Sequence, residues 1–263
     1  MLIDSPQNPQ VKFARTLQTS KGRKEHKLFF AEGPAVVAEA LMYSPGIEWI
    51  AWCPELANDD VTDLAGAAVE SEITVFEMSN RAFTAMSDTR SPQGIAAVIH
   101  QPYLRLSDIM LPLGACRILV LHDMRDPGNV GTMIRSADAL GATAVVLTAH
   151  CADPYEPKVV RATAGSLFHL PVVEIMWAEL EVWAKTNDFA LVTSCPTAKY
   201  ELGDAKLPER ALVIVGNEAH GLPEDILQQS DLMVKIPMRG KAESLNASTA
   251  AAIILYEYLR MAE

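Results

Sequence analysis

Apolar and polar positions follow two different periods along this chain. In the second half, short continuous apolar runs alternate with amphipathic stretches, a pattern typical of buried parallel strands joined by helices. The predicted strands there are residues 117–122, 144–148, 172–175, 190–193, 211–215 and 233–236. The predicted helices are residues 128–140, 157–164, 177–186, 223–229 and a last helix that opens near residue 246 and runs to 260. The pattern predicts an α/β fold.

The first hundred residues follow a similar but looser pattern. We predict helices over 9–19 and 61–70, a basic loop over 20–27, and a segment over 28–34 that enters a helix running to 41. Strands are predicted near 49–53, 75–78 and 94–99. These elements indicate a small α/β/α layer. Residues 101–114 contain Pro102, Pro112 and Gly114 and are the predicted linker. The expected domains are therefore 1–100 and 115–263.

The last helix is unusual because it is almost wholly apolar, which predicts that it is buried, yet its start is polar. Ser244, Asn246 and Ser248 gather where the strand Val234–Ile236 and a glycine-bearing loop lead into it. Local rules are most often broken where a sequence serves a function. This segment is therefore a candidate functional region.

Composition narrows the class of protein. The chain has 263 residues, enough for one large or two modest domains, and no apolar run reaches membrane-spanning length. Its N-terminus lacks the apolar core of a signal peptide. The four cysteines are far apart and form no C-x-x-C pair, so neither a zinc site nor a disulfide framework is expected. These features predict a cytoplasmic protein without a metal.

Charge is distributed unevenly. The net charge is −11, but residues 1–30 hold six basic and two acidic side chains, which leaves about −15 for the remainder. Such asymmetry is typical of a basic face that contacts phosphate, although it also fits a solvated helix surface.

Three predicted strands end in loops that are unusually polar, and ligands of open α/β sheets bind beyond the carboxyl ends of strands. The loop after 117–122 leads to Asn129, which is either a helix N-cap or a functional residue. Arg135 follows among apolar residues, where an arginine needs an anion.

The loop after 211–215 begins at Gly216, where a ligand could approach the backbone closely. Glu218 and His220 are either an acid–base pair or, respectively, a carboxylate that receives loop amides and a surface histidine. Neither loop matches a Walker A or G-x-G-x-x-G phosphate fingerprint.

Taken together and in order, the three loops resemble the motifs of the SpoU (TrmH-type) RNA ribose 2′-O-methyltransferases of the SPOUT superfamily. The motifs are Asn129-x-Gly131-x-x-x-Arg135, Gly216-Asn-Glu218-x-x-Gly221 and Ile236-Pro-Met followed by Ser244-Leu-Asn246-x-Ser248. The resemblance covers residues 117–260. Through Asn8-Pro and 28–34, the front half is similar to the L30e-like substrate-binding domain often fused ahead of this family.

The resemblance implies a trefoil knot, S-adenosylmethionine as cofactor and a homodimer with its active sites at the interface. It implies catalytic or functional polar roles for Asn129, Arg135, Glu218, Ser244 and Asn246. It implies cofactor contacts from Gly216, Asn217, Ile236, Met238, Leu245 and Asn246. Ala219 and Ala247 depart from the family pattern, which often has glycine and valine there, and this puts the loop geometry in question.

In the expected reaction, a ribose 2′-hydroxyl must be oriented and deprotonated. A guanidinium stays protonated, so we expect Arg135 to bind the target's phosphate and position the hydroxyl. Asn129, Ser244 and Asn246 would hold Arg135 and the ribose. Glu218 would set the conformation of its own loop and tune Arg135.

The expected substrate is structured RNA, with 23S rRNA favoured by analogy and tRNA as the alternative. RNA contacts are expected from basic residues outside the motifs, namely Lys21, Arg23, Lys24, Arg125, Arg161 and Arg239. Two other readings are an inactive RNA-binding relative and an enzyme acting on a small nucleotide.

Overall fold

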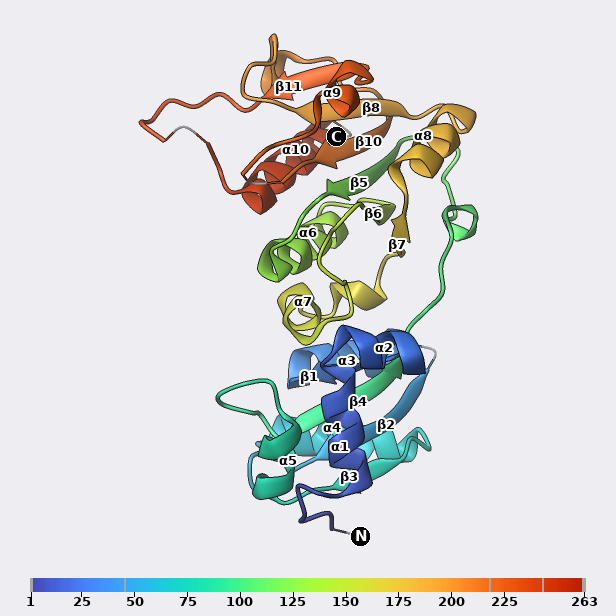
Figure 1. The fold of residues 1–263 in the computed structure, drawn as a ribbon, viewed down its shortest axis with the longest axis vertical. Helices are drawn as coiled ribbons and strands as arrows, with labels where there is room; N and C mark the ends of the chain where they lie inside the picture. The colour runs from blue at the N-terminus through green and yellow to red at the C-terminus, as the bar shows by residue number, and fades with distance from the viewer. Residues whose placement is uncertain (1, 45, 218, 243, 262–263) are drawn as a thin grey trace. The chain divides into compact units, whose positions relative to one another are not determined.

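The computed structural model describes residues 2–44, 46–217, 219–242 and 244–261. The chain divides into two compact units (Figure 1). The first consists of Met1–Tyr103 and Asp153–His169, and the second of Leu104–Ala152 and Leu170–Glu263. Among the described residues, none of the helices has both the length and the apolar character needed to cross a membrane.

The first unit is built on a four-stranded mixed sheet in the order β1-β4-β2-β3. Its strands are β1 (Leu28–Glu32), β2 (Ile47–Trp52), β3 (Val75–Glu77) and β4 (Ile95–His100). Strand β4 pairs antiparallel with both β1 and β2, and β3 is parallel to β2. Its helices are α1 (Pro9–Leu17), α2 (Ser20–His26), α3 (Pro34–Tyr43), α4 (Asp59–Glu70), α5 (Asn80–Met86), α7 (Pro157–Thr163) and the 3-10 turn η2 (Ser166–Phe168).

Helices cover both faces of this sheet, as the α/β/α prediction required. On one face, apolar side chains of α1 and α5 pack against Phe30, Trp49 and Val98. On the other face, α3 and α7 contact β1, and Phe29 lies against the rings of Tyr155 and Phe168.

The prediction of a basic loop over residues 20–27 was wrong. The segment forms helix α2, whose N-cap Thr19 accepts a hydrogen bond from Gly22 N at 3.1 Å. Lys27 ends the helix in the left-handed conformation, with a φ of 55°. A Cβ at residue 22 would lie 2.1 Å from the Thr16 carbonyl oxygen, so α1 and α2 meet closely only because glycine stands there. The helix has too few apolar residues to give a periodic signal.

Two boundaries also differ from the prediction. Residues 153–169 pack in the first unit although they lie between strands of the second. Most of the predicted linker, 101–114, is part of the second unit, because Leu106 and Ile109 are buried in its core around the 3-10 turn η1 (Leu106–Asp108). The prolines and glycine of this segment suggested a linker between domains. Its apolar residues instead place the segment in the second unit.

The second unit is built on a seven-stranded parallel sheet in the order β7-β6-β5-β10-β8-β11-β9. Its strands are β5 (Cys116–His122), β6 (Ala144–Thr148), β7 (Val172–Ile175), β8 (Ala190–Ser194), β9 (Tyr200–Glu201), β10 (Arg210–Val215) and β11 (Leu232–Lys235). Its helices are α6 (Pro127–Ala139), α8 (Trp177–Thr186), α9 (Glu224–Gln228), α10 (Ala247–Met261) and the 3-10 turn η3 (Leu202–Asp204).

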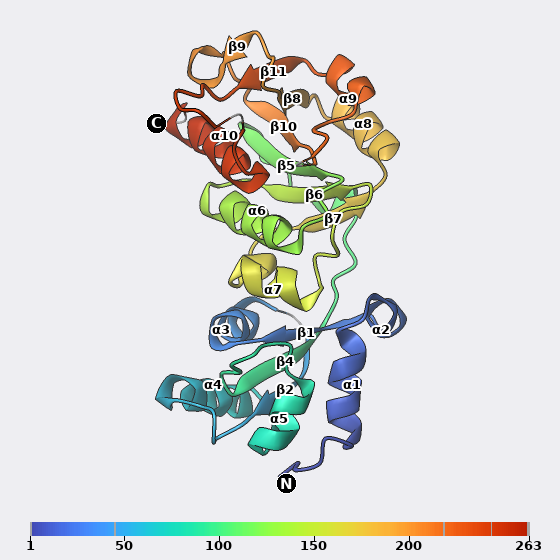
Figure 2. The same ribbon diagram turned by 60° about the vertical axis from the view of Figure 1, so that its left-hand side comes forward.

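Alternate residues of the strands face two helical layers, because successive side chains of a strand point to opposite faces. Ile118, Val120 and Leu212 share one core with apolar residues of α8 and α9. Helices α6 and α10 lie side by side over the other face (Figure 2). Helix α10 is buried on one side only, since Tyr256 is 56% and Leu259 39% exposed. The prediction that this apolar helix is buried therefore holds for one of its sides and is wrong for the other.

Because the sheet is parallel, the loops after β5, β10 and β11 leave it at the same edge. Strand β10 lies directly beside β5, and β8 separates β10 from β11. The three loops singled out by sequence are therefore gathered at one edge, as predicted, with the end of β8 among them.

Candidate active site

A side-chain bridge joins the loops after β5 and β10. Asn217 Nδ2 donates to the carbonyl oxygen of Asp123 at 2.9 Å and lies 3.4 Å from its carboxylate. Asn217 Oδ1 accepts from the backbone N–H groups of Ala219 and His220, at 2.8 and 3.2 Å. Asn217 therefore shapes its own loop and fixes it to the neighbouring one.

Asp123 occupies a strained position at the other end of this bridge. Its φ of 53° lies in the left-handed region, which non-glycine residues seldom adopt, although aspartate tolerates it better than most. Its carboxylate also accepts from Arg125 Nε at 2.9 Å. Arg125, expected to contact RNA, is thus engaged in an exposed ion pair within its own loop.

A second bridge joins the polar start of α10 to α6. Asn246 Nδ2 donates to Asn129 Oδ1 at 3.1 Å, across 117 residues of sequence. Asn246 Oδ1 accepts from the backbone N–H and the hydroxyl of Ser248, at 2.8 and 2.6 Å. The N-cap of α6 is Asp126, whose carboxylate accepts from Asn129 N at 2.9 Å. The N-cap interpretation of Asn129 was therefore wrong, and its side chain serves the contact with Asn246.

Arg135 lies on the exposed side of α6, while its neighbours Met133, Ile134 and Ala137 are buried. It forms no hydrogen bond or ion pair with any residue that the structure describes. The two asparagines, Asn129 and Asn246, bond each other and not Arg135, so the expectation that they and Ser244 hold Arg135 and the ribose stays a prediction. Arg135 is therefore available to a ligand.

The structure explains the need for glycine at position 216 differently from the sequence-based expectation. A Cβ at this position would lie 2.6 Å from backbone atoms of Gly221 and 2.7 Å from Leu222 N. The close approach is thus made by the loop's own backbone, which folds back after β10. Glu218 lies outside the described residues.

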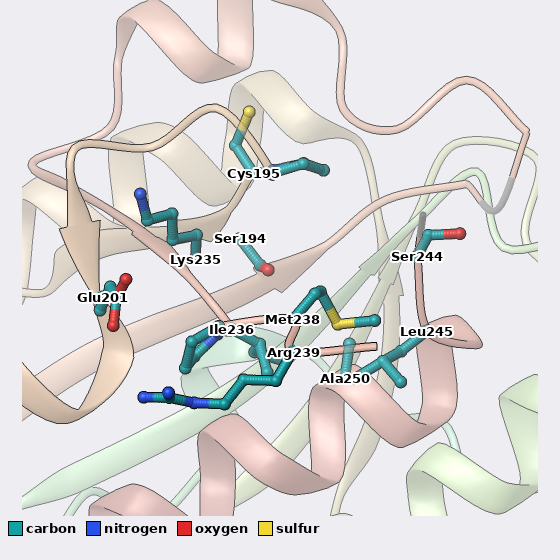
Figure 3. A pocket seen from close by; sticks show the side chains of 12 residues that line it. Ser194, Cys195, Glu201, Lys235, Ile236, Met238, Arg239, Ser244, Leu245 and Ala250 are labelled. Atoms are coloured by element: carbon teal, nitrogen blue, oxygen red, sulfur yellow. The ribbon is translucent and has the colours of Figure 1, made fainter. Parts of the chain in front are cut away.

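A pocket of ≈ 630 Å³ lies at the ends of β8 and β11 and at the start of α10 (Figure 3). Its lining includes the predicted cofactor residues Ile236, Met238 and Leu245 together with Ser244. Gly216, Asn217 and Asn246 are not among the described residues that line it. Asn217 and Asn246 hold the surrounding loops in place through their hydrogen bonds, and Gly216 lets its loop fold back closely.

The two ends of this pocket differ in chemistry. In Figure 3, the side chains of Lys235, Glu201 and Arg239 gather on the left, and those of Met238 and Leu245 lie to the right. The pocket therefore offers both signs of charge at one end and an apolar surface at the other.

Sequence reasoning missed Lys235, Pro237 and Ala250, which line the pocket within or beside the third motif. It also missed four lining residues from other segments, namely Ser194, Cys195, Pro196 and Glu201. Ser194 ends β8, and Cys195 and Pro196 follow it, so the rule that ligands bind beyond strand ends could have found them. Glu201 belongs to β9, a two-residue strand that is too short to give a periodic signal.

The residues expected to contact RNA fall into two groups. Lys21, Lys24 and Arg239 are exposed, so they remain candidates. Arg23 is only 2% exposed; it donates to the carbonyls of Leu17 and Gln18 and pairs with Asp153 at 2.7 Å. The prediction that Arg23 binds RNA was therefore wrong, because this side chain is occupied inside the first unit.

Arg161 is partly buried and pairs with Asp88 at 2.9 Å. Its role in RNA binding stays a prediction. Among the described residues, no group of three or more His, Cys, Asp or Glu side chains is placed to hold a metal ion.

Comparison with known proteins gives the fold and the site a context. The model of the SpoU rRNA Methylase family matches residues 117–256, and the model of the MRM3-like substrate binding domain matches residues 8–97. The chain is 36% identical over 254 residues to the 23S rRNA (guanosine(2553)-2′-O)-methyltransferase RlmP of Bacillus subtilis, covering 97% of each chain.

Solved structures agree over nearly the whole length. An AdoMet-bound rRNA methyltransferase from Sinorhizobium meliloti has a TM-score of 0.87 at 29% identity, covering 99% of this chain and 98% of that one. The SpoU methyltransferase AviRb of Streptomyces viridochromogenes, in complex with AdoMet, has a TM-score of 0.86 at 26% identity, covering 97% and 98%. The predicted methyltransferase fold preceded by a substrate-binding domain is confirmed, and the chain belongs to the SpoU rRNA methylase family.

Proposed function

We propose that this chain transfers a methyl group to a ribose 2′-hydroxyl of ribosomal RNA, with S-adenosylmethionine as methyl donor. The full-length similarity to RlmP, whose name states 2′-O-methylation of a guanosine in 23S rRNA, carries this proposal. The structures of AdoMet-bound relatives support the choice of methyl donor.

The pocket beside α10 fits this cofactor. Its volume lies in the range of roughly 300–1,000 Å³ that small-molecule sites occupy. Ile236 and Leu245 offer an apolar surface for the adenine, and Lys235, Glu201 and Arg239 offer charges of both signs for a zwitterionic methionine part. When bound, S-adenosylmethionine supplies an electrophilic methyl group on a sulfonium.

The residues of the chain then serve the ribose. The exposed guanidinium of Arg135 binds an RNA phosphate and so orients the adjacent ribose, while a phosphate oxygen or water accepts the hydroxyl proton. The Asn246–Asn129 bridge fixes the start of α10 against α6, which places Ser244 and Arg135 on one connected framework. Glu218 is assigned to its loop by family position alone.

We further propose that the chain forms a homodimer and that its carboxyl end is knotted as a trefoil, as the family resemblance implies. The exposed apolar side chains of α10 support the dimer, because Tyr256, Leu259 and Met261 are 56, 39 and 47% exposed on the helix that packs beside α6. Arg135 also lies exposed on α6, so a partner subunit would complete the site around it. With ribosomal RNA as substrate, the proposed location is the cytoplasm.

The dimer proposal is tested by Tyr256→Glu, which places a charge in the suggested interface. We expect a mass of one chain by analytical ultracentrifugation where the unaltered protein has that of two, together with loss of methyl transfer. A monomeric unaltered protein with full activity would contradict the dimer.

The function is tested by mapping 2′-O-methylation in ribosomal and transfer RNA from cells with and without the gene. We expect one ribose of 23S rRNA to lose its methyl group. A site in tRNA would correct the substrate. Calorimetry that detects no S-adenosylmethionine binding would instead favour an RNA-binding relative without activity.

A further inference from the structure

A second hollow lies at the same edge of the parallel sheet, away from the cofactor pocket. Its volume is ≈ 360 Å³, and residues 147–151 and 174–176 line it. These segments are the carboxyl ends of β6 and β7 and the residues that follow them. The hollow therefore occupies a position where parallel α/β sheets bind ligands, but none of the three motifs contributes to it.

Among the described residues that line this hollow, none is a lysine or an arginine. Glu174 places a carboxylate there instead. Burial raises the pKa of the Cys151 thiol to about 11, so this group is neutral as well. A phosphate is disfavoured by these surroundings, whereas an uncharged planar group with N–H donors is not.

Two side chains offer surfaces for such a group. Met176 is 68% exposed, although it is a large apolar residue, and His150 is also exposed. Thioethers make favourable contacts with aromatic rings, and imidazole rings stack on bases.

The hollow is connected directly to the candidate active site. Ala152 N donates to the carbonyl oxygen of Met124 at 2.8 Å, and Met124 N donates to Cys151 Sγ at 3.3 Å. The loop after β6 is thus bonded to the loop after β5, which leads to Asn129 and Arg135. Adjacent strands lie about 4.8 Å apart, so the hollow begins within roughly one or two strand spacings of β5.

We infer that this hollow receives the nucleobase of the nucleotide whose ribose is methylated. The inference rests on the proposed function. Proteins recognise RNA sequence mostly on unstacked nucleotides, whose bases are splayed out and bound by stacking and hydrogen bonds. The cofactor pocket reaches the start of α10, which the Asn246–Asn129 bridge joins to the start of α6. A ribose at this junction meets the cofactor on one side, so its base extends toward the β6 side.

The test replaces Met176 by aspartate. Met176 is the N-cap of α8 and makes no side-chain cap bond, and aspartate is favoured at this position, so the variant should fold. Val182→Asp is the matched control, because Val182 is 66% exposed on the same helix and receives the same charge. Methyl transfer to 23S rRNA from cells lacking the gene is measured together with S-adenosylmethionine affinity.

We expect Met176→Asp to raise KM for RNA about tenfold, in line with the loss of one base-stacking contact. The affinity of Met176→Asp for S-adenosylmethionine should not change. The KM of Val182→Asp for RNA should match that of the unaltered chain, and the KM of Met176→Leu should lie close to it. An equal KM for Met176→Asp and Val182→Asp, in a chain that does methylate rRNA, overturns the inference and leaves the proposed function intact. Absence of methylation by the unaltered chain overturns both.

A second measurement does not depend on turnover. A photoreactive benzophenone amino acid replaces Met176, and the crosslinked 23S rRNA is mapped by reverse transcription. We expect the crosslink at the nucleotide that the unaltered enzyme methylates. A crosslink confined to other nucleotides overturns the inference.

Discussion

Helices α2 and α6 each carry one arginine, and the two arginine side chains differ in their burial and in their hydrogen bonds. Arg23 of α2 is buried, donates to two backbone carbonyls and pairs with Asp153. Arg135 of α6 is exposed and bonds to none of the residues that the structure describes. An arginine whose donors are satisfied inside the fold stabilises it, whereas one left open can bind an anionic ligand. The two helices thus separate a structural from a functional use of the same side chain.

The largest effect is expected on the functional side of this comparison. Arg135→Ala should lower the turnover number by about 100- to 1,000-fold, the size seen when one preorganised donor is removed from an active site. S-adenosylmethionine affinity by calorimetry and the free energy of unfolding should hardly change. Weaker cofactor binding with residual turnover would contradict the proposed role.

On the structural side, Arg23→Ala should lower the free energy of unfolding by about 3 kcal/mol, because it leaves Asp153 without its buried partner. Urea denaturation measures this change, and Lys24→Ala on the same helix is the control, expected within about 0.5 kcal/mol of the unaltered chain. A double-mutant cycle with Asp153→Ala isolates the pair. If Arg23→Ala and Lys24→Ala had the same free energy of unfolding, Arg23 would not be a structural residue.

Asp123 offers an intermediate case, because it holds both an exposed arginine and the loop after β10. Asp123→Ala removes the acceptor of Arg125 and strains a residue at positive φ. We expect kcat/KM to fall roughly tenfold, which corresponds to a loss of about 1–2 kcal/mol of transition-state stabilisation. Asp123→Asn tolerates the backbone and keeps one carbonyl acceptor, so it should recover part of the activity. Full activity in the alanine variant would show that the Asp123 side chain is dispensable, because the variant keeps the backbone carbonyl that accepts from Asn217.

The exposed lysines of α2, Lys21 and Lys24, should bind RNA phosphates, whereas the buried Arg23 should not. Lys21→Gln combined with Lys24→Gln should weaken RNA binding and reduce the slope of log K against log salt by about 1.5, since each phosphate contact adds roughly 0.7–0.9. Filter binding at several salt concentrations measures the slope, with Lys185→Gln on α8 as a single-charge control. An unchanged slope would remove α2 from the RNA-binding surface.

The smallest effect concerns pH. Burial lowers the pKa of His122, which sits at the end of β5 and bonds to Thr148 Oγ1 at 2.8 Å. As the pH falls below the ordinary histidine value of about 6.5, the unfolded chain takes up a proton that the folded chain refuses. The free energy of unfolding should therefore decrease as the pH is lowered, and it should decrease less in His122→Gln. Parallel pH profiles of unfolding for the two proteins would contradict this assignment.

The sequence predicted the elements that carry strong periodic signals. The bounds of β6, β7 and α8 agree with the prediction to the residue, because each is a buried strand or an amphipathic helix with clear ends. The three motif loops were found for the same reason, since each follows such a strand. The resemblance to the family then gave them a meaning that spacing alone does not.

What the sequence could not reveal depends on partners far away along the chain. Arg23 looks like a surface residue until Asp153, 130 residues later, is known to meet it. The Asn246–Asn129 bridge spans 117 residues, and neither asparagine signals the other. Glu201 lies in a strand of two residues, which exists only because β11 provides its partner. These contacts are properties of the assembled structure.

The strand order of the second unit has a consequence for how the protein is made. Strand β10 pairs with β5 on one side and β8 on the other, so the centre of the sheet stays unfilled until residue 215 has left the ribosome. The first unit also waits, because Tyr155 and Phe168 complete its packing around Phe29. Neither unit can finish folding in the order of synthesis. Nascent chains should therefore expose apolar sheet edges for most of translation, and we expect slow folding that depends on chaperones.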